Sequence, residues 1–455
     1  MTAFAWTAEG VARALGFPAP GWTDAYSGVC TDTRVARAGD LYVALSGERF
    51  DGHDFLGEAR AAGVRGVVVR AGTARWPGVD WFEVDDTLAA LGRLARYRRD
   101  AFAGPVVAIT GTNGKTGTKE LLAAALGAVM KVHRSQANLN NLVGVPLTLL
   151  AAPLDAQAAV IECGANQRGE LARHREIVRP DVAVITNVGA GHLEGFGGIA
   201  QVMEEKVSLA VGAPTAVVGK PPELADAVRA VSGRVITVSE AGPADWTADG
   251  VTLLPDGRPR FTVRGVEVEL PVPGRHQVAN ALCALAAADA LGVRLADAAR
   301  GLAAAVLPGG RTTLFEVDGV TVINDTYNAN PASVSAALDL LQAVRGGRRT
   351  VVVVGTMREL GSAAADFHAS MAERILECRP DVVVAVGDFA PAFEALRTRA
   401  PATALLTGAD PGDVAERLKK ELRGGDIALF KASRGVRLEQ LFPILWPSYE
   451  GGEAH

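Results

Sequence analysis

The chain has few of the residues that mark several protein classes. Its 455 residues include 5% aromatic residues, no dense run of Lys and Arg, and a net charge of −5. A nucleic-acid-binding protein usually has a dense cluster of basic residues, and this sequence has none, so nucleic acid is not expected as a partner. The four cysteines are far apart and form no CxxC pair, which indicates neither a disulfide framework nor a zinc site. We expect them to be small buried residues; they are Cys30, Cys163, Cys283 and Cys378.

Long hydrophobic runs are also missing. The apolar stretch 121–130 ends well before the roughly 18 residues that span a bilayer, and the N-terminal sequence MTAFAWTAEG has no basic segment. We therefore expect a cytoplasmic protein, a monomer, with no membrane partner. Hydrophobic residues still make up 49% of the chain, mostly as Ala, Val and Leu, with abundant Gly. This composition is typical of helix-covered α/β sheets.

The length and the turn signals together predict three domains. A chain of 455 residues is too long for one core. An apolar strand at 106–110 follows Pro105 directly, and the segment VLPGGR (306–311) marks a second break. The expected domains are 1–103, 104–308 and 309–455.

Each expected domain has its own pattern of strands and helices. In the first, strands at 41–45 and 66–70 flank a helix that begins near His53, and a helix over 85–100 has Asp85 or Asp86 as its N-cap. The second repeats strand, loop and helix, with an antiparallel meander at 251–272. The third resembles a second doubly wound sheet. The expected parallel strands are 106–110, 158–164 and 181–189 in the second domain, and 320–325, 350–355, 381–387, 403–408 and 426–433 in the third.

A glycine-rich loop follows the strand at 106–110. The segment AITGTNGKTGTKE (108–120) has the GKT of a phosphate-binding loop, but Ile109 stands at the usual first glycine, so the box is shortened to GxxGKT. Glycine lets the backbone approach phosphate oxygens, and the following helix N-terminus supplies positive potential. Lys115 would reach the terminal phosphates and Thr116 would bind Mg²⁺. A glycine turn that merely starts a helix is the alternative.

The loop alone does not identify the reaction. The guanine-specifying NKxD of a GTPase and the loop set of a protein kinase are both absent from the sequence. Metal candidates follow the next two strands: Glu162 in VIECGAN and His192 in TNVGAGHLEGF. Both would lie at the carboxyl ends of parallel strands, where ligands bind. Taken singly, a strand-end residue of this kind is more often a capping or surface residue, and only together with the loop do the two favour a metal site.

Lys206 lies fourteen residues after His192, in the helical stretch QVMEEKVSLA. With Glu204 and Glu205 beside it, the pattern alone predicts an exposed lysine that makes helix ion pairs. An ammonium group cannot coordinate a metal.

Six motifs, in this order, resemble the Mur ligases of bacterial cell-wall synthesis over essentially the whole chain. They are GTNGKT, NLNNLVGVPLTLL (138–150), IECGAN, TNVGAGHLEGFGG (186–198) with Lys206, GRHQVANALCA (274–284) and NDTYNANPASVSAAL (324–338). The segments DTYNANPAS, VVVVGTMRELG (351–361) and DIALFKASRG (426–435) resemble the member that joins D-alanyl-D-alanine to UDP-N-acetylmuramoyl-tripeptide. The DNPR sequence that selects meso-diaminopimelate in another member is absent.

The resemblance implies a three-domain α/β enzyme. It would have an N-terminal α/β domain for the UDP substrate, a central P-loop ATPase with a parallel sheet and a small antiparallel sheet, and a C-terminal Rossmann-like domain that closes over the site. In this family ATP phosphorylates the tripeptide carboxylate, and the amino group of D-alanyl-D-alanine attacks the acyl phosphate through a tetrahedral intermediate. Two Mg²⁺ ions would neutralise the γ-phosphate and the developing charge.

The resemblance also implies a metal site, and it reverses the interpretation of Lys206. In these ligases the matching lysine reacts with CO₂ to form a carbamate, an anion able to bind metal. Glu162 would hold the first Mg²⁺, and His192 with carbamylated Lys206 would attend the second.

The nucleotide contacts implied by the resemblance come from both later domains. Gly111, Thr112, Asn113 and Gly114 would surround the phosphates with Lys115 and Thr116. His276 and Asn280 match the adenine-side motif, Asp325 the residue on the ribose hydroxyls, and Arg311 the arginine that reaches the phosphates from the last domain.

The substrate contacts are carried over in the same way. Thr33, Arg34 and His53 lie in segments that resemble UDP-binding loops, CTDTR (30–34) and SGERFDGHDF (46–55), with ordinary turn residues as the alternative. Asn138 and Asn141 would lie near the phosphates and substrate, and Tyr327, Asn328 and Asn330 near the dipeptide. Asn330-Pro331 also fits an N-cap followed by proline at the first helical position, and both interpretations can hold. His133 and His174 are expected to be structural or solvent-facing.

Some positions depart from the family pattern. Gln277 replaces an Asn of the adenine-side motif, Thr356 replaces the acid of GDMxELG, and Ala432 replaces the glycine of KGSR. KVSLA also lacks the acid that commonly follows the metal lysine.

The alternatives to this ligase function are another member of the superfamily, such as a folylpolyglutamate synthase, or a nucleotide-binding regulator without catalysis. The third residue of the tripeptide stays open.

Overall fold

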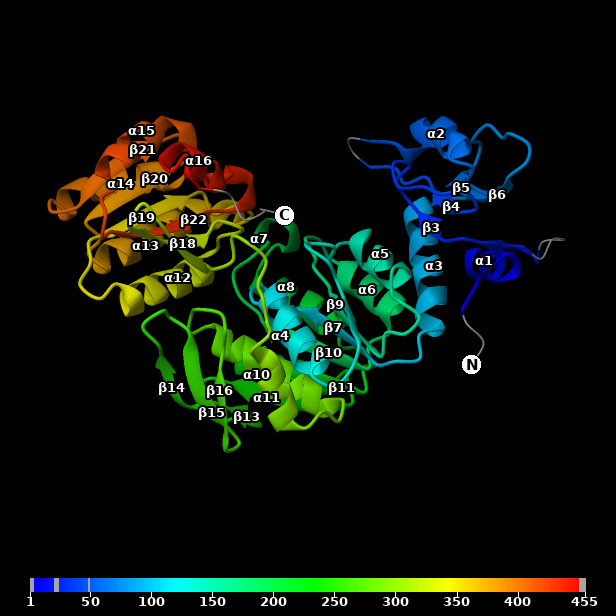
Figure 1. Ribbon diagram of the computed structural model, residues 1–455, viewed down its shortest axis with the longest axis horizontal. Helices are drawn as coiled ribbons and strands as arrows, with labels where there is room; N and C mark the ends of the chain where they lie inside the picture. Colours follow the sequence, from blue (N-terminus) through cyan, green and yellow to red (C-terminus); the bar gives the residue numbers. More distant parts are fainter. Residues whose placement is uncertain (1–3, 20–23, 48–49, 450–455) are drawn as a thin grey trace. The chain divides into compact units, whose positions relative to one another are not determined.

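The structure is a computed structural model that describes residues 4–19, 24–47 and 50–449 (Figure 1). The chain forms two compact units. The first comprises Met1–Ala108, Met130–Ala165 and Glu170–Asp181, and the second comprises Ile109–Val129, Asn166–Gly169 and Val182–His455. The segment predicted as one central domain thus contributes to both units, and the three predicted domain ranges remain predictions.

The first unit contains an antiparallel pair, β1 with β2, and a small parallel sheet. Its strand order is β3-β4-β5-β6, and every neighbouring pair is parallel. Asp86 is the N-cap of the helix that follows, since its Oδ1 accepts the N–H groups of Leu88 and Ala89 at 2.8 and 3.0 Å. The helix predicted to begin near His53 starts as a 3₁₀ turn, Gly52–Phe55. The elements are β1 (Trp6–Thr7), α1 (Ala8–Leu15), β2 (Ala25–Tyr26), β3 (Val29–Cys30), β4 (Leu41–Val43), η1 (Gly52–Phe55), α2 (Leu56–Ala61), β5 (Gly66–Arg70), β6 (Asp80–Val84), α3 (Thr87–Asp100), β8 (Val132–Arg134), α5 (Gly144–Leu150), β9 (Ala158–Glu162) and α6 (Glu170–Val178).

The largest sheet has seven strands in the order β13-β12-β11-β10-β7-β9-β8. Its strand β7 (Val106–Thr110) has the predicted bounds, and β10 (Val182–Asn187) lies within the predicted range. The predicted meander is confirmed as an antiparallel three-stranded sheet, with left-handed residues in its turns at Gly257 and Gly265. The other elements here are α4 (Lys115–Gly127), α7 (Leu193–Phe196), α8 (Ile199–Ser208), β11 (Thr215–Lys220), α9 (Pro222–Arg229), β12 (Arg234–Ser239), β13 (Trp246–Thr247), β14 (Asp249–Leu253), β15 (Pro259–Val263), β16 (Val266–Glu269), α10 (Gln277–Ala290) and α11 (Leu295–Leu302).

The last sheet has the order β17-β18-β22-β19-β20-β21, and it is parallel except for the antiparallel pair β17 and β18. The sequence did not predict β17. The elements are β17 (Thr313–Val317), β18 (Val320–Asp325), α12 (Pro331–Val344), β19 (Thr350–Gly355), η2 (Gly361–Ala363), α13 (Ala364–Glu377), β20 (Val382–Val386), α14 (Phe389–Leu396), η3 (Arg397–Arg399), β21 (Ala404–Gly408), α15 (Pro411–Glu421), β22 (Ile427–Lys431), η4 (Arg434–Val436), η5 (Leu438–Leu441) and α16 (Phe442–Leu445).

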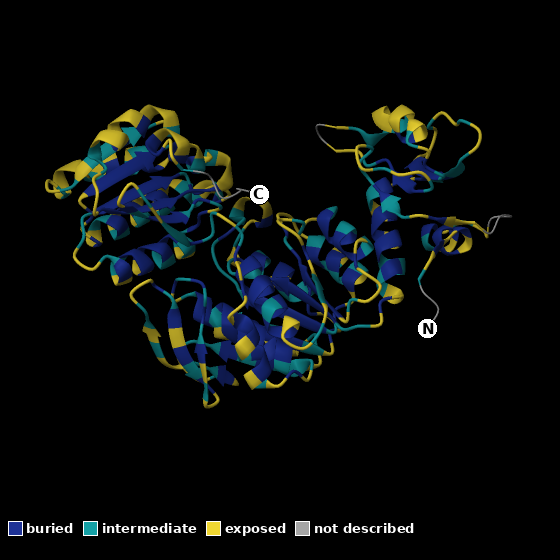
Figure 2. Cartoon of the chain, in the orientation of Figure 1, coloured by how far each residue is buried: buried dark blue, intermediate teal, exposed yellow. Residues whose placement is uncertain are grey.

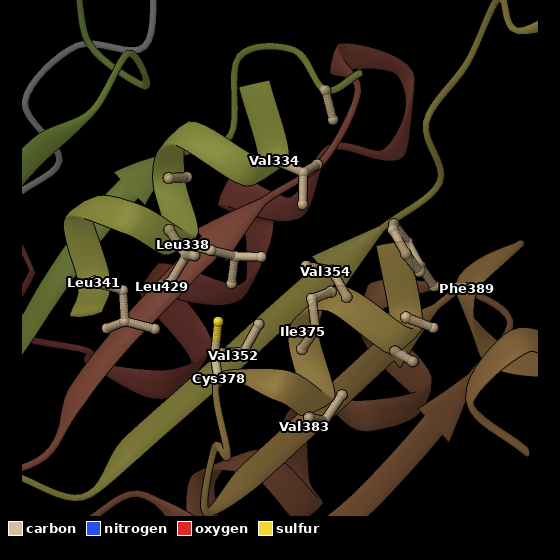
Figure 3. Packing of buried hydrophobic residues seen from close by; sticks show 14 of the residues in the cluster. Val334, Leu338, Leu341, Val352, Val354, Ile375, Cys378, Val383, Phe389 and Leu429 are labelled. Atoms are coloured by element: carbon tan, nitrogen blue, oxygen red, sulfur yellow. The ribbon is translucent and has the colours of Figure 1, made fainter. Parts of the chain in front are cut away.

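Both faces of the centre of this sheet are covered, which is why β19 (TVVVVG) and β20 (VVVAV) are nearly continuous valine runs. Alternate residues of β19 enter different cores. Val352 and Val354 pack with side chains of α12, α13 and α14 (Figure 3), whereas Val351 and Val353 pack with side chains of α15 and α16. Figure 2 shows these strands buried and the outer helix faces exposed. The doubly wound prediction is therefore confirmed.

The four cysteines are buried, as predicted. Burial raises the pKa of the Cys30 and Cys283 thiols to about 12. In the described part of the chain, no helix combines the length and the apolar composition that a membrane crossing requires.

Candidate active site

The glycine-rich loop joins β7 to α4. Ile109, at the position of the missing glycine, is fully buried inside β7, so the strand continues to Thr110 and the loop begins at Gly111. Gly111 and Gly114 have φ angles of 146° and 80°, and Gly114 is the N-cap of α4. Only glycine adopts these angles readily. The Nζ of Lys115 donates to the carbonyl oxygens of Gly111 and Thr112 at 2.8 and 3.2 Å, so this lysine lies over its own loop.

The end of β10 fixes the loop from one side. The N–H of Thr112 donates to the carbonyl oxygen of Asn187 at 3.0 Å, and the N–H of Asn113 donates to its Oδ1 at 2.9 Å. The Nδ2 of Asn187 donates back to the carbonyl oxygen of Asn113 at 3.0 Å. Sequence analysis did not single out Asn187; its signal was an amide residue at the end of a buried strand.

Asn113 also contacts the start of α12. Its Nδ2 donates to Oδ1 of Asn330 at 3.3 Å, and the Nδ2 of Asn330 donates to Oδ1 of Asn113 at 2.7 Å. Asn330 is at the same time the N-cap of α12, in a reciprocal capping box with Ser333 and with Pro331 at the first helical position. The N-cap interpretation is confirmed, and the same side chain reaches the phosphate loop.

The N-terminus of α10 lies against the loop. Asn280 faces it closely, because a Cβ atom on Gly114 would collide with the Asn280 side chain. The Nδ2 of Asn280 donates to Oε1 of Gln277 at 2.8 Å, so the departure at Gln277 supplies a partner for Asn280. His276 is half-buried, and the burial of its ring lowers its pKa. Among the described residues, its buried Nδ1 has no hydrogen-bond partner.

A second cluster lies at the carboxyl ends of β18 and β22, in the last sheet. The guanidinium carbon of Arg311 lies 3.6 Å from the centroid of the Tyr327 ring, a cation–π contact. The Oδ2 of Asp325 lies 2.6 Å from the Nζ of Lys431, which also donates to the carbonyl oxygen of Asn328 at 2.9 Å. Lys431 is 1% exposed. Sequence analysis missed Lys431, although the segment FKASRG that contains it was singled out.

The structure corrects the expectation, drawn from pattern alone, that Lys206 is exposed. It is 1% exposed on α8, and its Nζ lies 5.5 Å from the centroid of the Phe196 ring. Of the two adjacent acids, Glu204 pairs with Arg168 at 3.0 Å, and Glu205 accepts the N–H of Gly169 at 2.7 Å. The side chain of Lys206 is therefore enclosed by the protein, beside an aromatic ring, and is not exposed to solvent.

His192 is the N-cap residue of α7 and has a left-handed backbone, with φ 55°. Its Nδ1 lies 2.6 Å from Oε2 of Glu359, a residue of the GTMRELG loop. The nearby His192 ring holds the pKa of Glu359 below its ordinary value, although this Nδ1 makes no hydrogen bond of regular geometry among the described residues. Sequence analysis did not single out Glu359.

Glu162 lies in the first unit, at the end of β9, and is buried. The Nδ2 of Asn140 donates to its Oε1 at 2.8 Å. Asn141 instead caps the start of α5 through its Oδ1, which accepts the N–H of Gly144 at 2.8 Å, and Asn138 is exposed. Within NLNN it is thus Asn140, which sequence analysis did not name, that contacts the acid; the substrate-side roles of Asn138 and Asn141 stay predictions.

The predicted UDP residues also lie in the first unit. Arg34 forms an exposed ion pair with Asp32 at 2.6 Å, and Thr33 is half-buried. His53 uses both ring nitrogens, because Nδ1 lies 2.5 Å from Oδ1 of Asp51 and Nε2 accepts the N–H of Arg70 at 2.9 Å. Residues 48–49 of the predicted loop 46–55 lie outside the described residues.

Two other histidines fit structural roles. The Nε2 of His133 lies 2.7 Å from the carbonyl oxygen of Thr148, and the Nε2 of His174 lies 3.1 Å from the carbonyl oxygen of Gly164.

Two departures from the family pattern fit their surroundings. The Oγ1 of Thr356 accepts the N–H of Asp388 at 2.9 Å, a contact that a carboxylate also makes. Ala432 is fully buried against Gly355, where an added Cβ atom would lie 2.9 Å from the Ala432 side chain. Glycine at 355 therefore makes room for alanine at 432.

Three family models match the chain. They are the Mur ligase middle domain over residues 109–288, the Mur ligase glutamate ligase domain over 310–434, and the Mur ligase family catalytic domain over 25–99. The chain is 34% identical to the UDP-N-acetylmuramoyl-tripeptide–D-alanyl-D-alanine ligase of Bacillus subtilis over 423 residues, which cover 91% of this chain and 92% of that protein.

Solved structures give the same result. The MurF of Acinetobacter baumannii superposes with a TM-score of 0.87 at 32% identity, covering 98% of this chain and 99% of that one. The MurF ligase of Thermotoga maritima in complex with ADP has a TM-score of 0.80 at 29% identity, covering 92% and 96%. The three-domain fold class predicted from the sequence is confirmed. The chain belongs to the Mur ligase family.

Proposed function

We propose that this protein is an ATP-dependent ligase that joins D-alanyl-D-alanine to UDP-N-acetylmuramoyl-tripeptide in peptidoglycan precursor synthesis. The reaction forms an amide bond and releases ADP and phosphate. Phosphorylation of the tripeptide carboxylate makes phosphate the leaving group when the dipeptide amine attacks, and the intermediate is an acyl phosphate. We assign the reaction to the cytoplasm, where the nucleotide substrates are made.

The observation that carries the proposal is the direct contact between the phosphate loop and the acceptor segment. Asn113 belongs to the loop and Asn330 to DTYNANPAS, the segment that distinguishes the dipeptide-adding member of the family. ATP use is supported by the family and by the ADP complex of the T. maritima relative. The relative from B. subtilis, similar over nine-tenths of both chains, supports the same substrates.

ATP fits the described residues of the second unit. Gly111, Thr112, Asn113 and Gly114 form a backbone cradle at the N-terminus of α4, with Lys115 and Thr116 next in sequence. We assign His276 and Asn280 to the adenine side, Asp325 to the ribose and Arg311 to the phosphates. The unpartnered Nδ1 of His276, buried among the described residues, supports a ligand contact there.

Magnesium fits the chemistry of the proposed donors. Mg²⁺ prefers oxygen ligands and usually binds one or two carboxylates together with phosphates. Thr116 offers a hydroxyl and Glu162 a carboxylate that Asn140 orients. We propose His192 and a carbamate on Lys206 as the further ligands. Bound Mg²⁺ would offset negative charge on the phosphates and the reacting carboxylate.

The remaining proposed contacts are with the substrates. We assign Thr33, Arg34 and His53 to the UDP group, Asn138 and Asn141 to the substrate side of the phosphates, and Tyr327, Asn328 and Asn330 to the dipeptide. A domain closure that excludes water would protect the acyl phosphate from hydrolysis.

An acceptor panel tests the function. We expect phosphate release from ATP only when UDP-N-acetylmuramoyl-tripeptide and D-alanyl-D-alanine are both present, with the product identified by mass spectrometry. Tripeptides with lysine and with meso-diaminopimelate establish the third residue. Robust turnover with a single free amino acid would instead assign the chain to a different member of the superfamily, and phosphate release without any ligation product would point to a regulator.

A further inference from the structure

The loop between β19 and η2, residues 356–360, meets the start of α7 through two contacts. One joins side chains: the Nδ1 of His192 and Oε2 of Glu359 are 2.6 Å apart. The other joins backbones, since the N–H of Glu194 donates to the carbonyl oxygen of Glu359 at 3.4 Å. Glu359 has the left-handed φ of 65°, which is uncommon for a residue with a side chain. A backbone conformation of this kind persists where the surroundings hold it.

The rest of the loop is fixed by hydrogen bonds to the elements around the last sheet. The N–H of Met357 donates to Nε2 of the buried His368 at 2.9 Å, and the Nδ1 of His368 lies 2.7 Å from the carbonyl oxygen of Ala364. The N–H of Arg358 donates to Oγ of Ser433 at 2.9 Å. Two consecutive backbone groups before Glu359 are thus fixed by side chains from different elements. The carboxylate is presented to His192 from a rigid support.

We propose that Glu359 is a positioning residue for the ligase reaction: it fixes the ring of His192 through Nδ1, so that Nε2 is the ring nitrogen that faces the reacting groups. Histidines that bind metals almost always give their other nitrogen to a carboxylate, a carbonyl group or water, which sets the tautomer and the orientation of the ring. Here the carboxylate comes from the C-terminal part of the chain, so His192 is oriented only when loop 356–360 is docked. The inference rests on the proposed function for its catalytic consequence, but not for the His192–Glu359 contact.

The variant Glu359→Gln keeps the shape of the side chain and removes its charge. Glu194→Gln is the matched control, because Glu194 is an exposed acid on α7, the short helix that follows His192. We expect Glu359→Gln to lower kcat by about 10- to 100-fold and to weaken Mn²⁺ binding in the presence of ADP by a similar factor, as for other residues that orient a metal ligand. The KM values for tripeptide and dipeptide should stay within about twofold, and Glu194→Gln should match the wild type. Restoring the carboxylate one methylene shorter, in Glu359→Asp, should recover part of kcat.

Nitrogen NMR of the histidine rings supplies a readout that does not depend on ligation. With His192 identified by its loss in His192→Gln, the wild type should have the proton on Nδ1, and Glu359→Gln should give a mixture of tautomers. Circular dichroism would establish that each variant is folded. An unchanged His192 tautomer, or a kcat and Mn²⁺ affinity equal to those of Glu194→Gln, would overturn the proposal. If the wild type proved not to ligate these substrates, the tautomer comparison would still decide whether Glu359 orients His192.

Discussion

Asn113 and Asn330 are joined by two hydrogen bonds between their side-chain amides, although 217 residues separate them in the sequence. Asn113 belongs to the phosphate loop, and Asn330 lies in the acceptor segment, where it caps α12. The pair therefore connects the element proposed to hold ATP to the element proposed to hold the dipeptide.

This pair predicts energetic coupling between the two elements. Asn330→Ser keeps an N-cap hydroxyl but is too short to reach Asn113, and Asn113→Ala removes the partner. We expect each change to lower kcat/KM for D-alanyl-D-alanine and the double variant to be non-additive, with a coupling of about 0.5–3 kcal/mol, as for residues in contact. Asn113→Ala combined with Lys420→Ala, an exposed site on α15, should be additive. Additivity in the Asn pair would contradict the coupling.

The buried pair of Lys431 and Asp325 predicts a large effect on stability. Lys431→Met leaves a mostly buried carboxylate without its cation, which should lower the free energy of unfolding by about 3 kcal/mol. Lys131→Met is the control, since Lys131 pairs with Asp155 at 2.5 Å but both side chains are about two-thirds exposed. It should leave the stability nearly unchanged, because solvent screens an exposed ion pair. Calorimetry of the three proteins measures the difference, and equal shifts in Tm would refute the assignment.

Asp51 predicts an acid-sensitive contact in the first unit. The backbone N–H and the side chain of His53 donate to its carboxylate and lower its pKa from 3.8 to about 2. Because the folded-state pKa is below the unfolded one, the ionised carboxylate stabilises the fold above about pH 4, and this contribution is lost as the pH falls toward 2. Carbon NMR of the carboxyl groups should find this titration removed by Asp51→Asn and kept in Asp54→Asn. A midpoint near 3.8 would contradict the contact.

Lys206 predicts a carbamate. With ¹³C-labelled bicarbonate, we expect a carbamate resonance that is absent from Lys206→Ala. Lys119→Met should retain it, because Lys119 is equally buried but lies on α4 and not on α8, and it pairs with Glu120 at 2.9 Å. Lys206→Ala should also reduce kcat by about 100-fold or more, since it removes a proposed metal ligand rather than a neighbour of one. Full turnover in Lys206→Ala would exclude the two-metal scheme.

Much of the fold could be predicted because its signals are local. The bounds of β5, β7, β18 and β19 follow from apolar runs that end at turn residues, and the N-caps Asp86 and Asn330 act on N–H groups two or three residues away. The strand β17 was missed because TLFEV is short and only partly buried, and its pairing partner identifies it as a strand.

The candidate site divides in the same way. The phosphate loop could be identified from thirteen consecutive residues, because its glycines, lysine and threonine act within one turn of backbone. The burial of Lys206 could not, since the pattern of its own helix predicts exposure and only the packing of Phe196 reverses it. Asn140 was passed over for its neighbours because three asparagines in NLNN are equivalent until the chain folds.

The sequence by itself determined the α/β class, the loop that binds phosphate, the helix caps and the membership of the Mur ligase family. Those features depend on the residue types and on their spacing within short segments, and both are already present in the unfolded chain. The tertiary structure alone decided which distant side chains meet: Asn113 with Asn330, His192 with Glu359, and Asp325 with Lys431. Such contacts depend on how whole elements pack, and no local periodicity encodes their distance.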